Sequence, residues 1–86
     1  MNMKELELNY KKYLIFTKKD EIRLWKETIR EYKINIAELV LAEAKQEEIN
    51  KYVEFIKKHK KDIDNLELEI ANLIIEIDKL KKDINN

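Results

Sequence analysis

The side chains that could perform chemistry are a single histidine and several pairs of carboxylates. His59 is the one side chain whose ordinary pKa lies near neutral pH, and lysines surround it. A catalytic base or metal ligand needs partners, but the chain contains neither cysteine nor serine. The carboxylate pairs are close in sequence: Glu47 with Glu48, Asp62 with Asp64, and Glu67 with Glu69. Residues one or two apart on a helix do not face each other, so these pairs are interpreted as solvated surfaces.

Two further absences argue against an enzyme. Without glycine the chain has no phosphate-binding loop and no glycine turn for an oxyanion site. The Glu-x-x-His pair of helical di-metal sites is also missing. We therefore predict a non-enzymatic protein with no catalytic residues, no metal site and no cofactor. His59 is interpreted as a polar residue that fixes the register of packed helices.

The most compact basic cluster is a candidate site for polyanions. It consists of Lys57, Lys58, Lys60 and Lys61. An acidic stretch follows at once, and no aromatic residue is interleaved as a stacking platform. The chain has 18 basic and 18 acidic residues, hence a formal net charge of zero. Nucleic acid is therefore disfavoured as a partner, although a helical nucleic-acid-binding protein using this cluster remains an alternative function.

Three aromatic residues near the start of the chain are candidates for binding a partner protein. Tyr10 and Tyr13 belong to a short expected helix, and Phe16 falls outside the apolar stripe of that helix. Exposed aromatic side chains are frequent anchors of protein interfaces. The remaining aromatic residues lie mainly on apolar stripes and are expected to pack inside the protein.

The element that dominates the sequence is a long heptad repeat in its last third. Isoleucine recurs every seven residues from 49 to 84, with mostly leucine at the alternate position. This spacing predicts a long helix that packs along one seam. The seam residues are Ile49, Ile56, Ile63, Leu66, Ile70, Leu73, Ile77, Leu80 and Ile84.

A second stripe with the same spacing precedes this repeat. It comprises Ile22, Trp25, Ile29, Tyr32, Ile36 and Leu39. Ile36 and Ile49 are 13 residues apart rather than 14, which would rotate one stripe by about 100° from the other in a single helix. A turn within residues 42–50 removes the conflict. The sequence thus predicts two antiparallel helices paired about residue 46, although no glycine marks the turn.

The helix boundaries are predicted from polar stretches. Thr17 followed by Asp20 resembles a capping box, which predicts a break between a short first helix and the second. One continuous helix with a polar patch is the alternative. A second possible break, at residues 57–62, is disfavoured because the heptad passes through it unshifted. We expect a single helical domain, 1–86, with helices at about 3–16, 19–45 and 48–85.

The long last helix leads us to expect an oligomer. At 1.5 Å per residue it would measure about 57 Å, longer than the second helix. Its end, residues 75–84, would expose isoleucine and leucine unless the first helix or another subunit covered it. A parallel two-stranded dimer is disfavoured, because Asp62 would meet Glu67 of the partner chain and apolar residues widen the seam. The predicted fold is all-α: a long antiparallel hairpin with a short N-terminal helix, assembling into an oligomeric bundle with a dimer favoured.

These observations favour a protein that acts by binding another protein. The composition resembles that of small accessory proteins of phages and mobile elements in AT-rich bacteria, although no motif carries the resemblance. It implies a phage-type regulator or inhibitor that occludes or bridges a partner. The alternative is a structural coiled-coil adaptor. No apolar run is long enough to span a membrane, and we expect a cytoplasmic protein, in a bacterial host cell if a phage encodes it.

Overall fold

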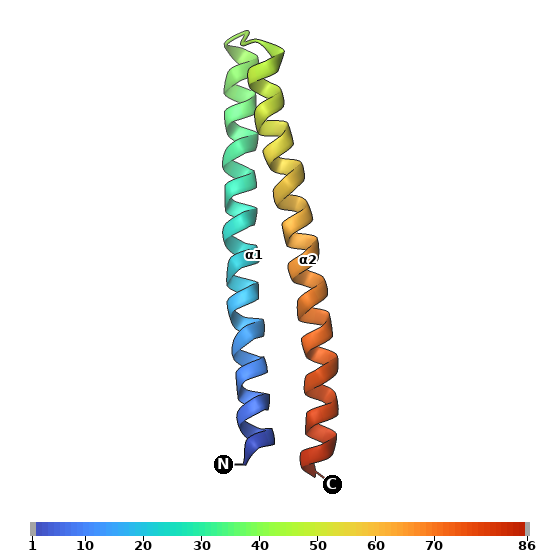
Figure 1. Ribbon diagram of the computed structural model, residues 1–86. Helices are drawn as coiled ribbons and strands as arrows, with labels where there is room; N and C mark the ends of the chain where they lie inside the picture. The colour runs from blue at the N-terminus through green and yellow to red at the C-terminus, as the bar shows by residue number, and fades with distance from the viewer. Residues whose placement is uncertain (1, 86) are drawn as a thin grey trace.

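The protein is a two-helix hairpin in the shape of a rod (Figure 1). The computed structural model describes residues 2–85. Helix α1 spans Met3–Leu41 and helix α2 spans Gln46–Asn85, and these residues form no strand. The two helices run antiparallel along a rod of 65 × 16 × 13 Å. The predicted all-α antiparallel hairpin is thus confirmed, with two helices in place of three.

The predicted break between residues 17 and 21 is wrong, because α1 continues through it. The hydroxyl of Thr17 donates to the carbonyl oxygen of Leu14 at 2.9 Å, a bond made within the helix instead of a cap. Asp20 accepts hydrogen bonds from the guanidinium of Arg23, one turn later on the same helix. Both polar side chains are therefore satisfied without ending the helix. The actual N-cap is Asn2, whose side-chain oxygen accepts from the backbone N–H of Glu5 at 2.8 Å.

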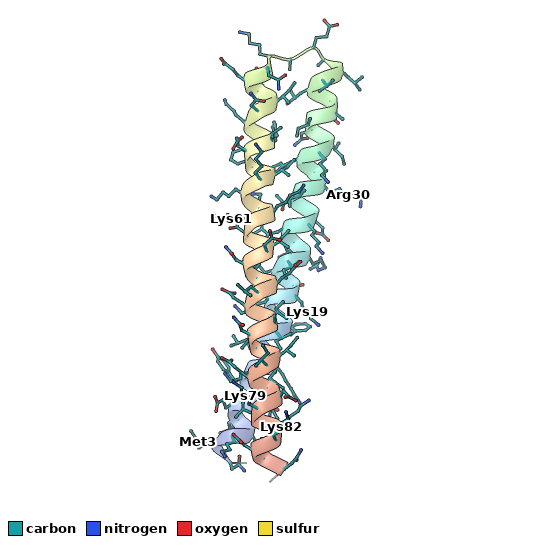
Figure 2. The ribbon with its side chains drawn as sticks, turned by 90° about the vertical axis from the view of Figure 1, so that its right-hand side faces the viewer. Met3, Lys19, Arg30, Lys61, Lys79 and Lys82 are labelled. Carbon is teal, nitrogen blue, oxygen red and sulfur yellow. The ribbon has the colours of Figure 1, made fainter. Side chains whose placement is uncertain are left out.

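The hydrophobic core is a ladder of isoleucines between the helices. Ile22 and Ile29 of α1 are buried together with Ile56, Ile63 and Ile70 of α2. Half-buried residues pack against this cluster at both of its ends and along its edges: Ile15, Trp25, Tyr32, Ile36 and Leu66. Because the isoleucines recur every seven residues on both helices, the seam winds slowly around the rod. In Figure 2 the two helices accordingly cross in projection.

The turn between the two helices forms without a glycine residue. Glu43 takes the left-handed backbone conformation, with φ at 55°. The N–H of Glu43 then donates to the carbonyl of Val40, and the N–H of Ala44 donates to that of Leu39. This pattern is the Schellman motif, which normally has glycine at the position of Glu43. The turn therefore closes at residues 42–45, inside the predicted range, at some backbone strain.

The end of α2 is covered by α1, which corrects the expectation of an overhanging tail. Because α1 is continuous, its first half reaches along the last turns of α2. Leu73 and Ile77 are buried there, and Leu80 and Ile84 are half-buried. Residues 75–84 thus need no second chain to cover their seam. α2 itself runs through residues 57–62 without a break, as its unshifted heptad predicted. Neither helix has a stretch apolar enough to cross a membrane in the part of the chain described.

Candidate protein-binding surface

An outward-facing aromatic surface lies on the first half of α1. Tyr10, Tyr13 and Phe16 leave 60%, 61% and 69% of their surface exposed. At about 100° per residue, Tyr13 points away from the direction of the buried Ile22, nine residues later. Tyr10 and Phe16 lie about 60° to either side of it. The structure therefore places all three predicted partner-binding residues on the side of α1 that faces away from α2.

This aromatic surface belongs to a second apolar stripe on the same helix. Met3 and Leu6, both exposed, precede Tyr10 and Tyr13 at spacings of three and four residues. A stripe with this alternation is what a packed helix presents to a partner. The first half of α1 thus has two apolar stripes. One of them, which includes Leu8 and Ile15, packs against α2, and the other faces outward.

The neighbouring half of α2 also exposes aliphatic side chains. Leu68, Ile74 and Ile75 leave about half or more of their surface exposed. Leu68 and Ile75 are seven residues apart and share the outward side of α2. This side and the aromatic surface of α1 form opposite edges of the rod. The end of the rod that holds both termini is therefore apolar on two edges.

The half of the rod nearest the turn instead turns its aromatic residues inward. The ring of Trp25 stacks on His59 with centroids 4.3 Å apart and planes 18° apart. The ring centroid of Tyr32 lies 5.8 Å from that of His59 and 5.6 Å from that of Tyr52. His59 is buried, as its place in the heptad predicts. Trp25, Tyr32 and Tyr52 are thus half-buried in the seam, whereas Phe55, beside Tyr32, leaves 47% of its surface exposed.

His59 lies in the seam between the two helices, against aromatic rings. Its Nδ1 is buried and has no hydrogen-bond partner among residues 2–85. The nearest carboxylate oxygen, Oδ2 of Asp62, is 3.5 Å away on the same helix. In the described part of the chain no three histidine or carboxylate side chains converge in a way that could hold a metal ion. Aromatic rings surround His59, and packing against these rings explains why the side chain is buried.

Two lysines occupy the seam where the aromatic layers end. Lys11 and Lys18 are half-buried at the positions that continue the spacing of Trp25 and Tyr32. The Nζ of Lys11 donates to Glu76 at 2.9 Å, and that of Lys18 donates to Glu69 at 2.8 Å. The hydrogen bond to Glu76 is the main reason that the pKa of Lys11 is raised; the negative charges of Glu76 and Glu7 act in the same direction, and partial burial opposes them.

The predicted polyanion cluster is spread around α2. Lys57, Lys58, Lys60 and Lys61 are all exposed, and they cover more than one side of the helix. Lys60 lines a groove together with basic residues of α1, whereas Lys57 pairs with Glu54 of its own helix at 3.4 Å. The four lysines therefore do not form one site by themselves.

Sequence reasoning missed the part of the seam that precedes residue 22. Leu8 and Ile15 continue the spacing of Ile22, Ile29 and Ile36 without a shift. This was the available signal for one continuous helix, but the more apolar outward stripe concealed it. Comparisons with models of protein families, with curated proteins and with solved structures found no match for this chain.

Proposed function

We propose that this protein is a non-enzymatic binding protein that packs the terminal end of its rod against another protein. The observation that carries the proposal is the outward stripe of α1, where Tyr10 and Tyr13 are about 60% exposed on a well-formed helix. Large aromatic side chains on a rigid helix bury much area at a small cost in conformational entropy. Two apolar edges at one end also suit a protein that bridges two surfaces.

The proposal has a regulatory form and a structural form. In the regulatory form the protein occludes or bridges a cellular partner, and the compositional resemblance to phage accessory proteins supports a phage-type regulator or inhibitor. In the structural form it is a coiled-coil adaptor whose partner is a second copy. Self-association through the apolar edges would give a dimer as the simplest assembly. Both forms use the same surface and differ in the partner.

The test compares two double variants that add the same charge. Tyr10→Lys with Tyr13→Lys places two lysines on the aromatic surface. Leu24→Lys with Ile34→Lys is the matched control, because both residues are exposed on the outward side of α1 but lie nearer the turn than the aromatic surface. Neither change touches the buried seam, so we expect circular dichroism to show unchanged helicity for both. Sedimentation equilibrium and affinity capture from a bacterial lysate then report self-association and partner binding.

Each outcome has a distinct meaning. Stoichiometric capture of one protein, lost with the tyrosine variant and kept with the control, supports the regulatory form. Concentration-dependent self-association with the same loss, and no captured protein, supports the adaptor. A wild-type protein that stays monomeric and captures nothing contradicts the proposal, as does equal loss of binding in both variants.

A further inference from the structure

The folded rod separates its charges onto two long sides. One side, the basic face, carries six basic residues of α1, and Glu27 is the acidic residue of α1 that lines a groove together with them. The six basic residues are Lys12, Lys19, Arg23, Lys26, Arg30 and Lys33. They follow each other by three, four or seven residues, so they project from one side of the helix. Figure 2 shows Lys19 and Arg30 on the same side of α1.

The grooves between the helices confirm that this side and its opposite differ in charge. On the basic face, a groove of about 500 Å³ is lined by Lys26, Arg30 and Lys33 of α1 and by Lys60 of α2, with Asp64 as its acidic residue. On the other side, the groove beside Trp25 is lined by Glu21, Asp62 and Glu69, and it has no basic residue.

The net charge of zero is a sum over the whole chain, so it does not describe the local charge of either face. Salt screens exposed charges beyond about 8 Å at physiological ionic strength. The rod is 16 × 13 Å in cross-section, so a ligand on one face is largely screened from the other. The expectation against nucleic acid rested on the net charge and on the cluster at residues 57–61, and neither accounts for the stripe on α1.

Most of the basic face is free to bind a ligand. Lys12, Lys19, Lys26, Arg30, Lys33 and Lys60 are exposed. None of these six forms an ion pair with any residue in the described range 2–85. Arg23 differs, since it pairs with Asp20 and Glu27 of its own helix at 2.9 Å each. Unpaired cations in a row can exchange small counterions for a polyanion, which is the main source of affinity for nucleic acids.

We propose that the basic face binds the phosphate backbone of duplex DNA. Lys12 and Lys33 lie about 32 Å apart along α1 at 1.5 Å per residue, close to one turn of the duplex. Proteins that bind single strands stack bases on aromatic side chains, but the face has none between Lys19 and Lys33. The basic face therefore contacts phosphates without reading bases, and we expect binding that does not depend on DNA sequence.

The experiment measures fluorescence anisotropy of a labelled 20-base-pair duplex and of the single strand of the same length. With about five phosphates neutralised, the affinity for the duplex should fall about 500-fold between 50 and 200 mM salt. The test variant is Lys26→Glu with Arg30→Glu and Lys33→Glu. The control is Lys51→Glu with Lys58→Glu and Lys79→Glu, which changes the net charge equally at exposed positions of α2 away from the basic face.

We expect the test variant to bind the duplex at least about 30-fold more weakly than the wild type, and the control to lose less than about fivefold. The glutamine versions of both triple variants should keep this order if the charge reversals disturb the fold. The proposal is overturned if the wild type does not bind at 50 mM salt, if both variants lose affinity equally, or if the single strand binds more tightly than the duplex. Salt-dependent self-association in light scattering, lost with the test variant in the absence of DNA binding, would assign the face to a second copy of this chain.

Discussion

In the half of the rod nearest the turn, the seam of α1 alternates isoleucine with Trp25 and Tyr32. In the half nearest the termini, the same alternation pairs aliphatic residues with Lys11 and Lys18. Trp25 and Tyr32 of the turn half stack inside the hairpin, whereas Tyr10, Tyr13 and Phe16 of the terminal half point outward. Both halves belong to the same two helices and keep the same heptad spacing.

The difference between the halves separates what builds the hairpin from what the hairpin offers to a partner. The turn half places its large apolar side chains in the core, where they stabilise the pairing of the helices. The terminal half closes its seam partly with the ion pairs Lys11–Glu76 and Lys18–Glu69, which contribute little to stability because both glutamates are exposed to solvent. Its tyrosines are thereby left for interactions outside the chain. We expect stability to be concentrated in the turn half and binding of a partner protein in the terminal half.

The largest expected effect is the loss of a core isoleucine in the turn half. Ile29 is 7% exposed at the centre of the isoleucine ladder, whereas Ile15 is half-buried in the terminal half. Ile29→Ala should lower the free energy of unfolding by about 3 kcal/mol, and Ile15→Ala by about 1 kcal/mol, because less of Ile15 leaves water on folding. Chemical denaturation monitored by circular dichroism measures both values. Equal losses would contradict the proposed division of stability.

A smaller effect, of opposite sign, is expected at His59. Replacing the histidine removes a buried Nδ1 without a hydrogen-bond partner but also removes its stacking on Trp25. His59→Leu should stabilise the hairpin by about 1 kcal/mol, and His59→Phe by at least as much, since a phenyl ring retains the stack. The denaturation midpoint of each variant is compared with that of the wild type. A lower midpoint for both would show that His59 stabilises the fold.

The smallest effect concerns the pH dependence of the terminal half. The hydrogen bond to Glu76 raises the pKa of Lys11 above its value in the unfolded chain. Its contribution to stability is therefore complete below the unfolded pKa and is lost as the pH rises through the folded pKa. As the pH rises above about 10.5, the ordinary pKa of lysine, Lys11→Met should lose less stability than the wild type. Lys61→Met, at an exposed lysine, is the control, and an equal change in the two variants would exclude a specific role for Lys11.

The hairpin could be predicted from the sequence because a single interval between two isoleucines requires a turn. The 13-residue interval between Ile36 and Ile49 requires a turn, and the isoleucines on either side of the turn form the core. The continuity of α1 was missed for a physical reason. A threonine that could cap a new helix can also bond to the carbonyl three residues earlier, and only the folded chain shows which bond forms.

The candidate surfaces were predictable to different degrees. Tyr10 and Tyr13 could be named from sequence because they belong to an expected short helix that could lie loosely, and Phe16 because it falls outside the stripe of that helix. The basic face could not be recognised in the sequence, because its residues on α1 are up to seven positions apart. Lys60, which lies beside them in the folded protein, comes from the other helix. Such a surface emerges only when the register of the two helices is known.

The placement of both chain ends at one end of the rod has a mechanical consequence (Figure 1). A force that pulls the beginning of α1 away from the end of α2 acts across the seam, and it opens one heptad at a time. The layers with Lys11 and Lys18 open before the stacked rings of Trp25 and His59, and the layer of Tyr32 and Tyr52 opens after those rings. A partner that holds both termini would thus clamp the hairpin at the place where separation begins.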